Sequence, residues 1–242
     1  MVIEPPKSIS DQIYEYLKTR ILYGEIEAGE RLAQEKVAEQ LEISRMPVRE
    51  AFRRLEQDGL VERLPQGGVR ATPITMETIR HVFGVRTALE AYAIELACDR
   101  ISEEAIAALE NIKRQAQGVL KQDALDQSEK LKRFFDLNTA FHDTIYEATG
   151  NLYLIKIILQ LRNLVLRMRA IGLREDSTWI QVWKEHDQLL NSLKRRDKEA
   201  ATRCIRQHIA NAASYVTAVV RTAESTTTPS RMDRGLEKHT RK

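Results

Sequence analysis

The segment SRMPVREAFRRLEQDGLV, from Ser44 to Val61, constrains the fold most, because it predicts one amphipathic helix with two chemically different sides. Pro47 suits a first helical position, where a backbone N–H is not needed, and Gly59 suits the position just past the end. One side is apolar at helical spacing and would face a core. Its members are Val48, Phe52 and Leu55.

The other side of this helix carries arginines. Arg45, Arg49 and Arg53 are each four residues apart, so they share one outward flank. The planar guanidinium group can bind guanine O6 and N7 in pairs or hold phosphate oxygens. An isolated helix of this kind is more often a solvated amphipathic surface, and the neighbouring segments decide between the two interpretations.

The neighbouring segments predict a winged helix-turn-helix. Ser10 is expected to cap a first helix that ends near Gly24, and a short second helix covers about Gln34 to Leu41. After the arginine helix, Val61 to Leu64 and Val69 to Thr72 are typical of two strands joined by a glycine-containing turn.

From Ser10 to Thr72 the chain resembles the GntR family of bacterial transcription regulators, in GEIEAGERL, SRxPVREAxxxLxxxGLV and a glycine-containing wing. The resemblance implies that the arginine helix enters the major groove and that the wing tip enters the minor groove. Met46 departs from the family, which usually has a capping Thr there. The implied DNA-contacting residues are Ser44, Arg45, Pro47, Arg49 and Arg53 of the helix, and Gln66, Gly67 and Gly68 of the wing.

Overall charge does not reveal a DNA partner. The chain has 38 Lys and Arg against 35 Asp and Glu, and residues 1–72 hold 11 basic and 13 acidic side chains. The DNA face must therefore be a local basic stripe, and we expect weak binding to DNA of arbitrary sequence.

Composition predicts a mainly helical, cytoplasmic protein without a membrane partner. The chain is 43% hydrophobic and has only 10 Gly and 6 Pro. It has neither an apolar run long enough to span a bilayer nor the charge order of a signal peptide. Cys98 and Cys204 lack metal-binding spacing and are expected to be reduced packing residues.

Beyond Thr72 the pattern predicts a bundle of six helices, with Thr75, Ser102 and Asp197 as N-caps. The expected helices cover about 75–99, 102–121, 128–149, 152–172, 179–196 and 198–223. We therefore expect a DNA-binding domain over 1–74, an effector-binding and dimerisation domain over 75–223, and a disordered tail over 224–242.

Three histidines of this second half are candidate metal ligands: His142, His186 and His208. Asn138 lies four residues before His142, so both project from one helix face. Three imidazoles and one oxygen suit a transition metal with positions left for a ligand, whereas scattered histidines are more often packing or surface residues.

The segments DLNTAFHDTIYEATGN (136–151) and EHDQLLNSLKRRDKEAATRCIRQH (185–208) resemble the FCD effector domain of the FadR subfamily. Its metal-binding members use an acidic or amide residue, a His four residues later and two further His. The resemblance therefore implies a divalent metal, Zn²⁺ first with Ni²⁺ or iron as alternatives, on Asn138, His142, His186 and His208. Many members have Asp at the first position, so Asn138 makes this site one negative charge poorer.

A further family feature is VRTALEAYAIELA, from Val85 to Ala97, in which the resemblance implies that Arg86 binds an effector carboxylate. A helix-surface pair between Arg86 and Glu90 is an equal alternative. Other arginines are expected on a solvated face: Arg162, Arg167, Arg169 and Arg174.

The resulting hypothesis is a homodimeric repressor that binds a two-fold symmetric operator and responds to a small carboxylate. One alternative is a metal-free regulator that responds to acyl-CoA, which would not need the histidines. The other is a three-histidine metal hydrolase, against which the sequence contains neither HExxH nor the ExxH pair of di-iron bundles.

Overall fold

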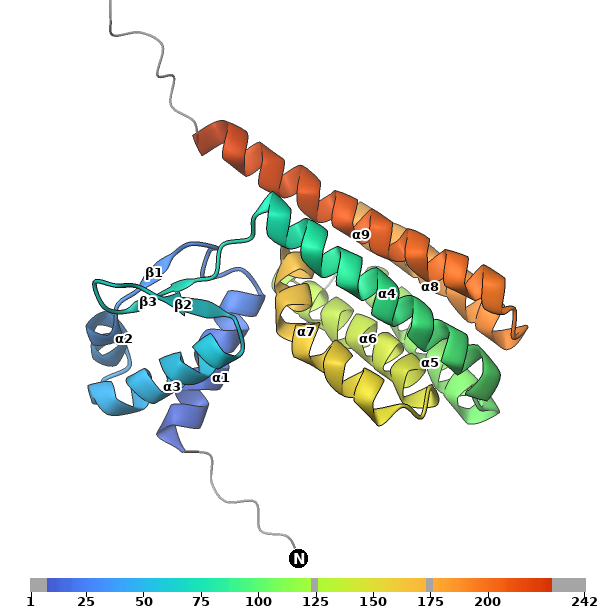
Figure 1. Cartoon of the computed structure of the whole chain (residues 1–242), viewed down its shortest axis with the longest axis horizontal. Coiled ribbons are helices and arrows are strands. Elements are labelled where there is room, and N and C mark those ends of the chain that lie inside the picture. The colour runs from blue at the N-terminus through green and yellow to red at the C-terminus, as the bar shows by residue number, and fades with distance from the viewer. Residues whose placement is uncertain (1–7, 123–125, 173–175, 228–242) are drawn as a thin grey trace, which may run out of the picture.

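The computed structural model describes residues 8–122, 126–172 and 176–227, and within them the chain forms a small head followed by a helical bundle (Figure 1). We call residues 8–72 the head and residues 76–227 the bundle. The head contains α1 (Ile9–Leu22), β1 (Arg31–Leu32), α2 (Gln34–Gln40), α3 (Arg45–Gln57), β2 (Val61–Arg63) and β3 (Val69–Ala71). This is the predicted winged helix-turn-helix.

The wing is a three-stranded antiparallel sheet in the order β1-β3-β2. The predicted hairpin pairs Val61 with Ala71, and Arg31 of β1 pairs with Arg70 on the other side of β3. The sequence did not predict β1, because a strand of two residues has no measurable alternation.

Two helix starts in the head differ from the prediction. The N-cap of α1 is Ser8 and not Ser10, because Ser8 Oγ accepts from the Asp11 N–H and the Asp11 carboxylate accepts from the Ser8 N–H. Helix α3 begins at Arg45, so Pro47 occupies its third position and not its first. The proline is still tolerated, because the first four N–H groups of a helix have no partner within it.

The bundle contains the six predicted helices: α4 (Met76–Arg100), α5 (Glu103–Leu120), α6 (Gln127–Ala148), α7 (Leu152–Gly172), α8 (Asp176–Lys194) and α9 (Lys198–Thr227). The side chains of Thr75, Ser102 and Asp197 accept from backbone N–H groups as expected of caps. Helix α6 instead begins after Asp126, whose carboxylate is its cap.

Two further helix boundaries differ from the prediction. Helix α8 begins at Asp176, three residues before the prediction, and α9 continues to Thr227. The rest of the predicted tail, 228–242, lies outside the described residues. No helix that the structure describes is both long and apolar enough to cross a membrane.

Large apolar side chains from several bundle helices form one core, in which α4 and α9 lie side by side (Figure 1). The Trp179 ring stacks on Phe134 at 5.0 Å between centroids, and Phe141 stacks on His186 at 4.4 Å. Cys98 is buried and Cys204 half-buried, both as free thiols. His142, His186 and His208 are buried in the bundle as well.

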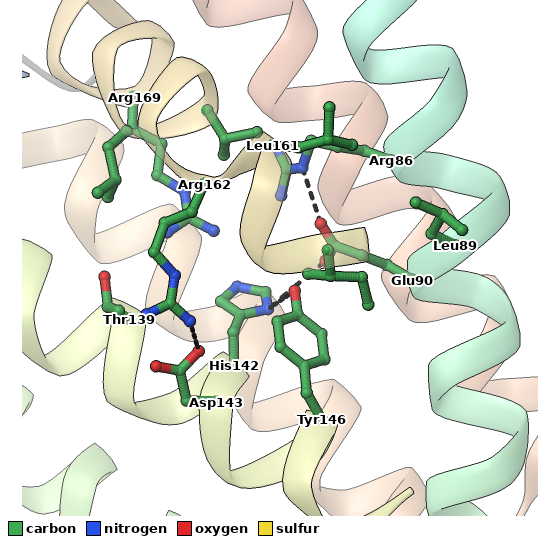
Figure 2. Close-up of a pocket in the computed structure, with 13 residues that line it drawn as sticks. Arg86, Leu89, Glu90, Thr139, His142, Asp143, Tyr146, Leu161, Arg162 and Arg169 are labelled. Atoms are coloured by element: carbon green, nitrogen blue, oxygen red, sulfur yellow. Dashed lines mark hydrogen bonds and ion pairs between the residues drawn. The ribbon is translucent and has the colours of Figure 1, made fainter. Parts of the chain in front are cut away.

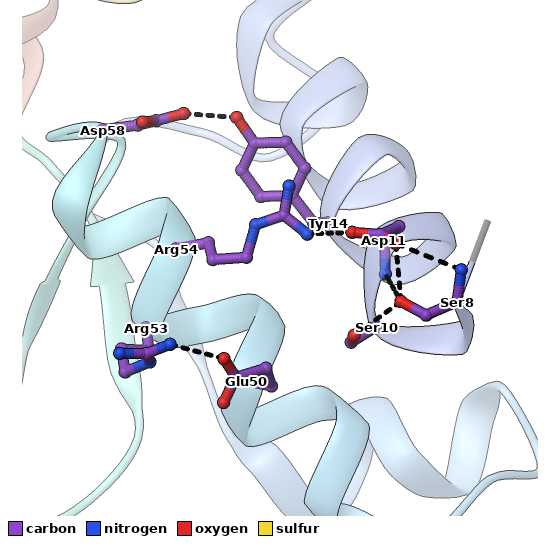
Figure 3. A network of polar contacts seen from close by, with 8 residues as sticks. All are labelled: Ser8, Ser10, Asp11, Tyr14, Glu50, Arg53, Arg54 and Asp58. Atoms are coloured by element: carbon purple, nitrogen blue, oxygen red, sulfur yellow. Dashed lines mark hydrogen bonds and ion pairs between the residues drawn. The ribbon is translucent and has the colours of Figure 1, made fainter. Parts of the chain in front are cut away.

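The head contacts the bundle through α7. Asn163 Nδ2 donates to Asp58 Oδ2 over 3.2 Å, and Arg167 Nη2 donates to the Thr72 carbonyl over 2.8 Å. Asp58 is the C-cap of α3 and also accepts from the Tyr14 hydroxyl, which ties α1 to the same point (Figure 3). The arginine helix is therefore linked directly to one helix of the bundle.

Candidate DNA-contacting face and metal centre

The predicted DNA face lies on the outer side of α3 and on the wing. Arg45, Arg49 and Arg53 are all exposed, while the apolar side of the same helix is buried in the head core. Ser44, Gln66 and Gly67 are exposed as well, and Pro47 and Gly68 are half-buried. Most of the residues that were expected to contact DNA are therefore accessible on α3 and on the wing turn.

Glycine is required at the wing turn. Gly67 and Gly68 have φ values of +87° and +79°, in the left-handed region. A Cβ atom on Gly68 would also lie 2.8 Å from the carbonyl oxygen of Leu32. A residue with a Cβ atom would therefore be strained at either position.

The structure brings the three predicted histidines together from three helices. His142 lies on α6, His186 on α8 and His208 on α9. All are buried, and one ring nitrogen of each lies within 4.8 Å of the others. The Nε2 atoms of His142 and His186 are 3.3 Å apart. Asn138 is 1% exposed, and its Oδ1 has no hydrogen-bond partner in the described part of the chain.

Two of these histidines have a hydrogen-bond partner at Nδ1. His208 Nδ1 lies 2.8 Å from Glu185 Oε2, and the other oxygen of Glu185 accepts from Gln181 and Asn211. His142 Nδ1 lies 3.4 Å from the Tyr146 hydroxyl. A carboxylate on Nδ1 directs Nε2 toward a metal and makes it a better ligand.

Burial favours the neutral form of His142 and His186. It holds the pKa of His142 well below the ordinary 6.5, with a further contribution from the Arg169 guanidinium. The pKa of His186 is lowered in the same way, first by burial and then by His208. Neutral imidazoles are the form that binds metals, so the cluster and the unpartnered oxygen of Asn138 fit a transition-metal ion.

A cavity of about 40 Å³ lies beside His142 (Figure 2). Arg86 and Glu90 enter it from α4, whereas Arg162 and Arg169 enter it from α7. Its lining is Arg86, Leu89, Glu90, Thr139, His142, Asp143, Tyr146, Ile158, Leu161, Arg162, Val165, Leu166 and Arg169.

Arg86 pairs with Glu90 over 2.7 Å as one alternative predicted, but the pair is buried and not on the surface. Burial raises the pKa of Glu90, yet attraction to Arg86 and Arg169 outweighs it and the net pKa is lowered. Both Nη atoms of Arg86 lack a partner among the described residues. The pair therefore still presents donors for a ligand.

The predicted solvated face of arginines is wrong. Arg162 pairs with Asp143 at the cavity, and Arg169 lines the cavity without an ion pair to any described residue. Arg167 is 3% exposed, and burial lowers its pKa to about 10. Arg174 lies outside the described residues. The error arises because α4, α9 and α1 of the head pack against α7.

Three residues of the site were missed: Glu185, Tyr146 and Arg169. A signal existed for each of them. Glu185 directly precedes His186, Tyr146 follows His142 by one helical turn, and Arg169 follows Arg162 by seven residues, which places both on one helix face.

Both the head and the bundle match known protein families. Residues 9–70 match the model of the gntR family of bacterial regulatory proteins, and residues 81–211 match that of the FCD domain. The transcriptional repressor RspR of Escherichia coli is 28% identical over 86% of this chain and 88% of its own. The repressor GlaR of the same organism is 29% identical over 81% and 90%. The solved structure of E. coli McbR/YncC, 22% identical, has a TM-score of 0.68 and covers 88% of this chain and 99% of that one.

Proposed function

The chain belongs to the GntR family of bacterial regulatory proteins, with a C-terminal FCD domain, and is a DNA-binding transcription regulator; we propose that it is a cytoplasmic repressor controlled by a small carboxylate bound beside a metal ion. RspR and GlaR are named as repressors, which supports the direction of control. The buried histidine cluster beside an arginine-lined cavity is the observation that carries the proposal.

The DNA half of the proposal is a homodimer on a two-fold symmetric operator, with one head on each half-site. Arg45 and Arg49 meet base edges or nearby phosphates, and Arg53 meets the backbone. Gln66, Gly67 and Gly68 enter the minor groove. Replacing Arg49 with Ala is expected to weaken operator binding without unfolding the head, because its side chain is exposed.

The metal half of the proposal uses His142, His186 and His208 as ligands and Asn138 as an oxygen donor. Three nitrogens and a neutral oxygen favour Zn²⁺, with Ni²⁺ or iron as alternatives. A bound divalent ion would supply a Lewis-acidic position for one oxygen of the effector. Because no ligand of this set is anionic, an anionic effector would complete the charge balance.

Charge and size of the cavity support a small anion as effector. Its lining holds three arginines against two carboxylates, Glu90 and Asp143, and Arg169 is the arginine without an ion pair among the described residues. The pKa of Arg169 is lowered to about 10, mainly by burial, so it stays charged at neutral pH. A volume of 40 Å³ accommodates about three water molecules, which disfavours an acyl-CoA in this conformation.

Helix α7 is the proposed connection between effector and DNA. Its Arg162 and Arg169 side chains reach the cavity, whereas Asn163 and Arg167 bind the head. An anion that attracts Arg169 would shift α7 and with it the support of α3. The effector controls DNA binding only if its affinity differs between the two arrangements.

Elemental analysis of tag-free protein tests the metal centre. About one transition metal per chain is expected in the wild type, and His186→Ala should lose it. His81→Ala is the matched control, because His81 is exposed on α4 and should keep the metal. Equal metal contents in the wild type and His186→Ala would remove this residue from the site.

A further inference from the structure

Helix α4 has an apolar side that stays exposed in the described part of the chain. Helices α6, α7 and α9 pack against its other sides (Figure 1). No exposed residue of α4 between His81 and Asp99 is charged. These exposed residues are Gly84, Val85, Ala88 and Tyr92. A helix that is apolar on every side is normally buried, so this side of α4 is expected to have a partner.

The start of α7 extends the exposed apolar side of α4. Leu152 is 79% exposed, and Leu159 lies two turns later on the same side of α7 and is exposed as well. The two helices join through half-buried apolar residues that pack against Leu154 and its neighbours: Leu89 and Leu96 of α4, and Ile155 and Ile158 of α7. We call this surface the outer face, and its members are Val85, Leu89, Tyr92, Leu96, Leu152 and Leu159.

The outer face has the spacing of a helix–helix contact. From Val85 through Leu89 and Tyr92 to Leu96, its members on α4 are four, three and four residues apart, as in helices that pack along their length. Single exposed apolar residues are normal on a soluble protein, whereas a contiguous apolar patch marks an interaction site. The outer face is therefore expected to bind another helical surface.

The order of residues along α4 fits a second copy of the same chain. Val85 lies three residues before Ala88, and Tyr92 lies three residues after Leu89. If two α4 helices pair antiparallel about a two-fold axis at that midpoint, each Tyr92 meets the Val85 of the other copy. The small side chain of Ala88 allows the two helices to approach closely at the axis. The apolar part of the outer face is thus complementary to itself.

The two ends of this side of α4 are complementary as well. His81 lies one turn before Val85 and can donate an imidazole N–H, whereas Asp99, which also pairs with Lys198, carries a carboxylate two turns after Tyr92. An antiparallel pair places the first end of one copy beside the last end of the other. A polar rim around an apolar centre is the usual anatomy of a protein interface.

We propose that the outer face is the surface on which a second copy of this chain docks, with the two α4 helices antiparallel and the two-fold axis near Ala88. The inference deepens the proposed function and rests on it only in that the regulator is a homodimer. Leu89 also lines the cavity beside His142, so one wall of the effector cavity belongs to the interface. The two-fold axis gives the two heads the relation that a symmetric operator requires.

Sedimentation of a dilution series of the full chain measures the dissociation constant of the dimer. Tyr92→Glu places one charge from each copy in the apolar centre and should raise this constant about 30-fold or more, as loss of an interface hot spot does. Ile180→Glu is the matched control, because Ile180 is 47% exposed against 49% for Tyr92 and lies on α8 outside the outer face. This control should dissociate like wild type. Circular dichroism verifies that both variants are folded.

A disulfide near the axis tests the antiparallel arrangement without adding a charge. A residue beside a two-fold axis meets its own copy, so Ala88→Cys should form a disulfide-linked dimer on oxidation. Ala108→Cys, at an exposed position of α5, is the control and should give no linked dimer on a denaturing, non-reducing gel. Both variants also carry Cys204→Ser, which removes the half-buried native thiol.

The outcomes separate the surface from the homodimer itself. A wild-type dimer that withstands Tyr92→Glu, or Ala88→Cys protein that crosslinks no faster than Ala108→Cys protein, would overturn the assignment of the outer face and leave the homodimer of the proposed function intact. A wild-type chain that stays monomeric at every concentration would contradict both. Dissociation by Tyr92→Glu together with crosslinking at position 88 is the expected result.

Discussion

Replacing Glu185 with Gln tests the orientation of the histidine cluster, because this carboxylate holds the ring of His208. One of its oxygens lies 2.8 Å from His208 Nδ1, and the other accepts from Gln181 and Asn211 at 3.1 and 2.6 Å. A carboxamide has one oxygen acceptor and one NH₂ donor. If the NH₂ group faces His208, the acceptor for His208 Nδ1 is lost. If it faces Gln181 and Asn211, it places a third amide donor against two donors.

The expected cost follows from that count. A charge-assisted bond is about twice as strong as a neutral one, and loss of an outer partner of a metal-bound histidine typically lowers metal affinity about 10- to 100-fold. We expect Glu185→Gln to lie near the tenfold end, about 1.4 kcal/mol, since the substitution keeps size and one acceptor. Glu185→Ala should lie nearer the hundredfold end.

The assay is competition for Zn²⁺ between protein and a chromogenic chelator at fixed pH. Asp187→Asn is the control, because it removes one charge from the same helix and its carboxylate pairs with Lys113 away from the cluster. This control should bind Zn²⁺ like wild type. A dissociation constant for Glu185→Gln equal to that of wild type would refute the inferred orientation of His208.

Three further predictions concern coupling and stability. Asn163→Ala removes a bond to Asp58 but no cavity residue, so it should keep Zn²⁺ binding and reduce the effect of a small bound anion, tested with acetate, on the operator dissociation constant; an undiminished effect would argue against α7 as the connection. Glu42→Gly should raise the free energy of unfolding by about 0.5–1 kcal/mol in urea titrations, because Glu42 has a φ of +54° that glycine adopts without strain. In metal-free protein the pKa values of His142 and His186 are lowered, so as the pH falls these histidines become protonated in the unfolded chain before they do in the folded one. Their contribution to the free energy of unfolding is therefore complete above pH 6.5 and falls below it by about 1.4 kcal/mol per pH unit per histidine. Unfolding free energies that stay flat from pH 7.5 to about 5.5 would contradict their burial as neutral groups.

Local patterns in the sequence were sufficient for the helix-turn-helix and for the six bundle helices. The Val48, Phe52 and Leu55 spacing defines which side of α3 is buried, and Thr75 and Ser102 cap the helices that follow them. These features depend on neighbouring residues in the chain, so periodicity and capping predict them. The cap of α1 was placed two residues too late, because Ser8 and Ser10 are both suitable caps, and the cap of α6 at Asp126 was not predicted.

The environment of each charged side chain was decided only by tertiary packing. Periodicity indicates that Arg162 and Arg169 share one face of α7 and that Arg167 lies on another, but not which helix or domain covers each face. In the structure the first two meet a cavity and the third meets the head. The convergence of His142 with His186 of α8 and His208 of α9 depends likewise on how distant segments pack. Sequence spacing determines direction around a helix axis, whereas burial and partners depend on the elements that pack against it.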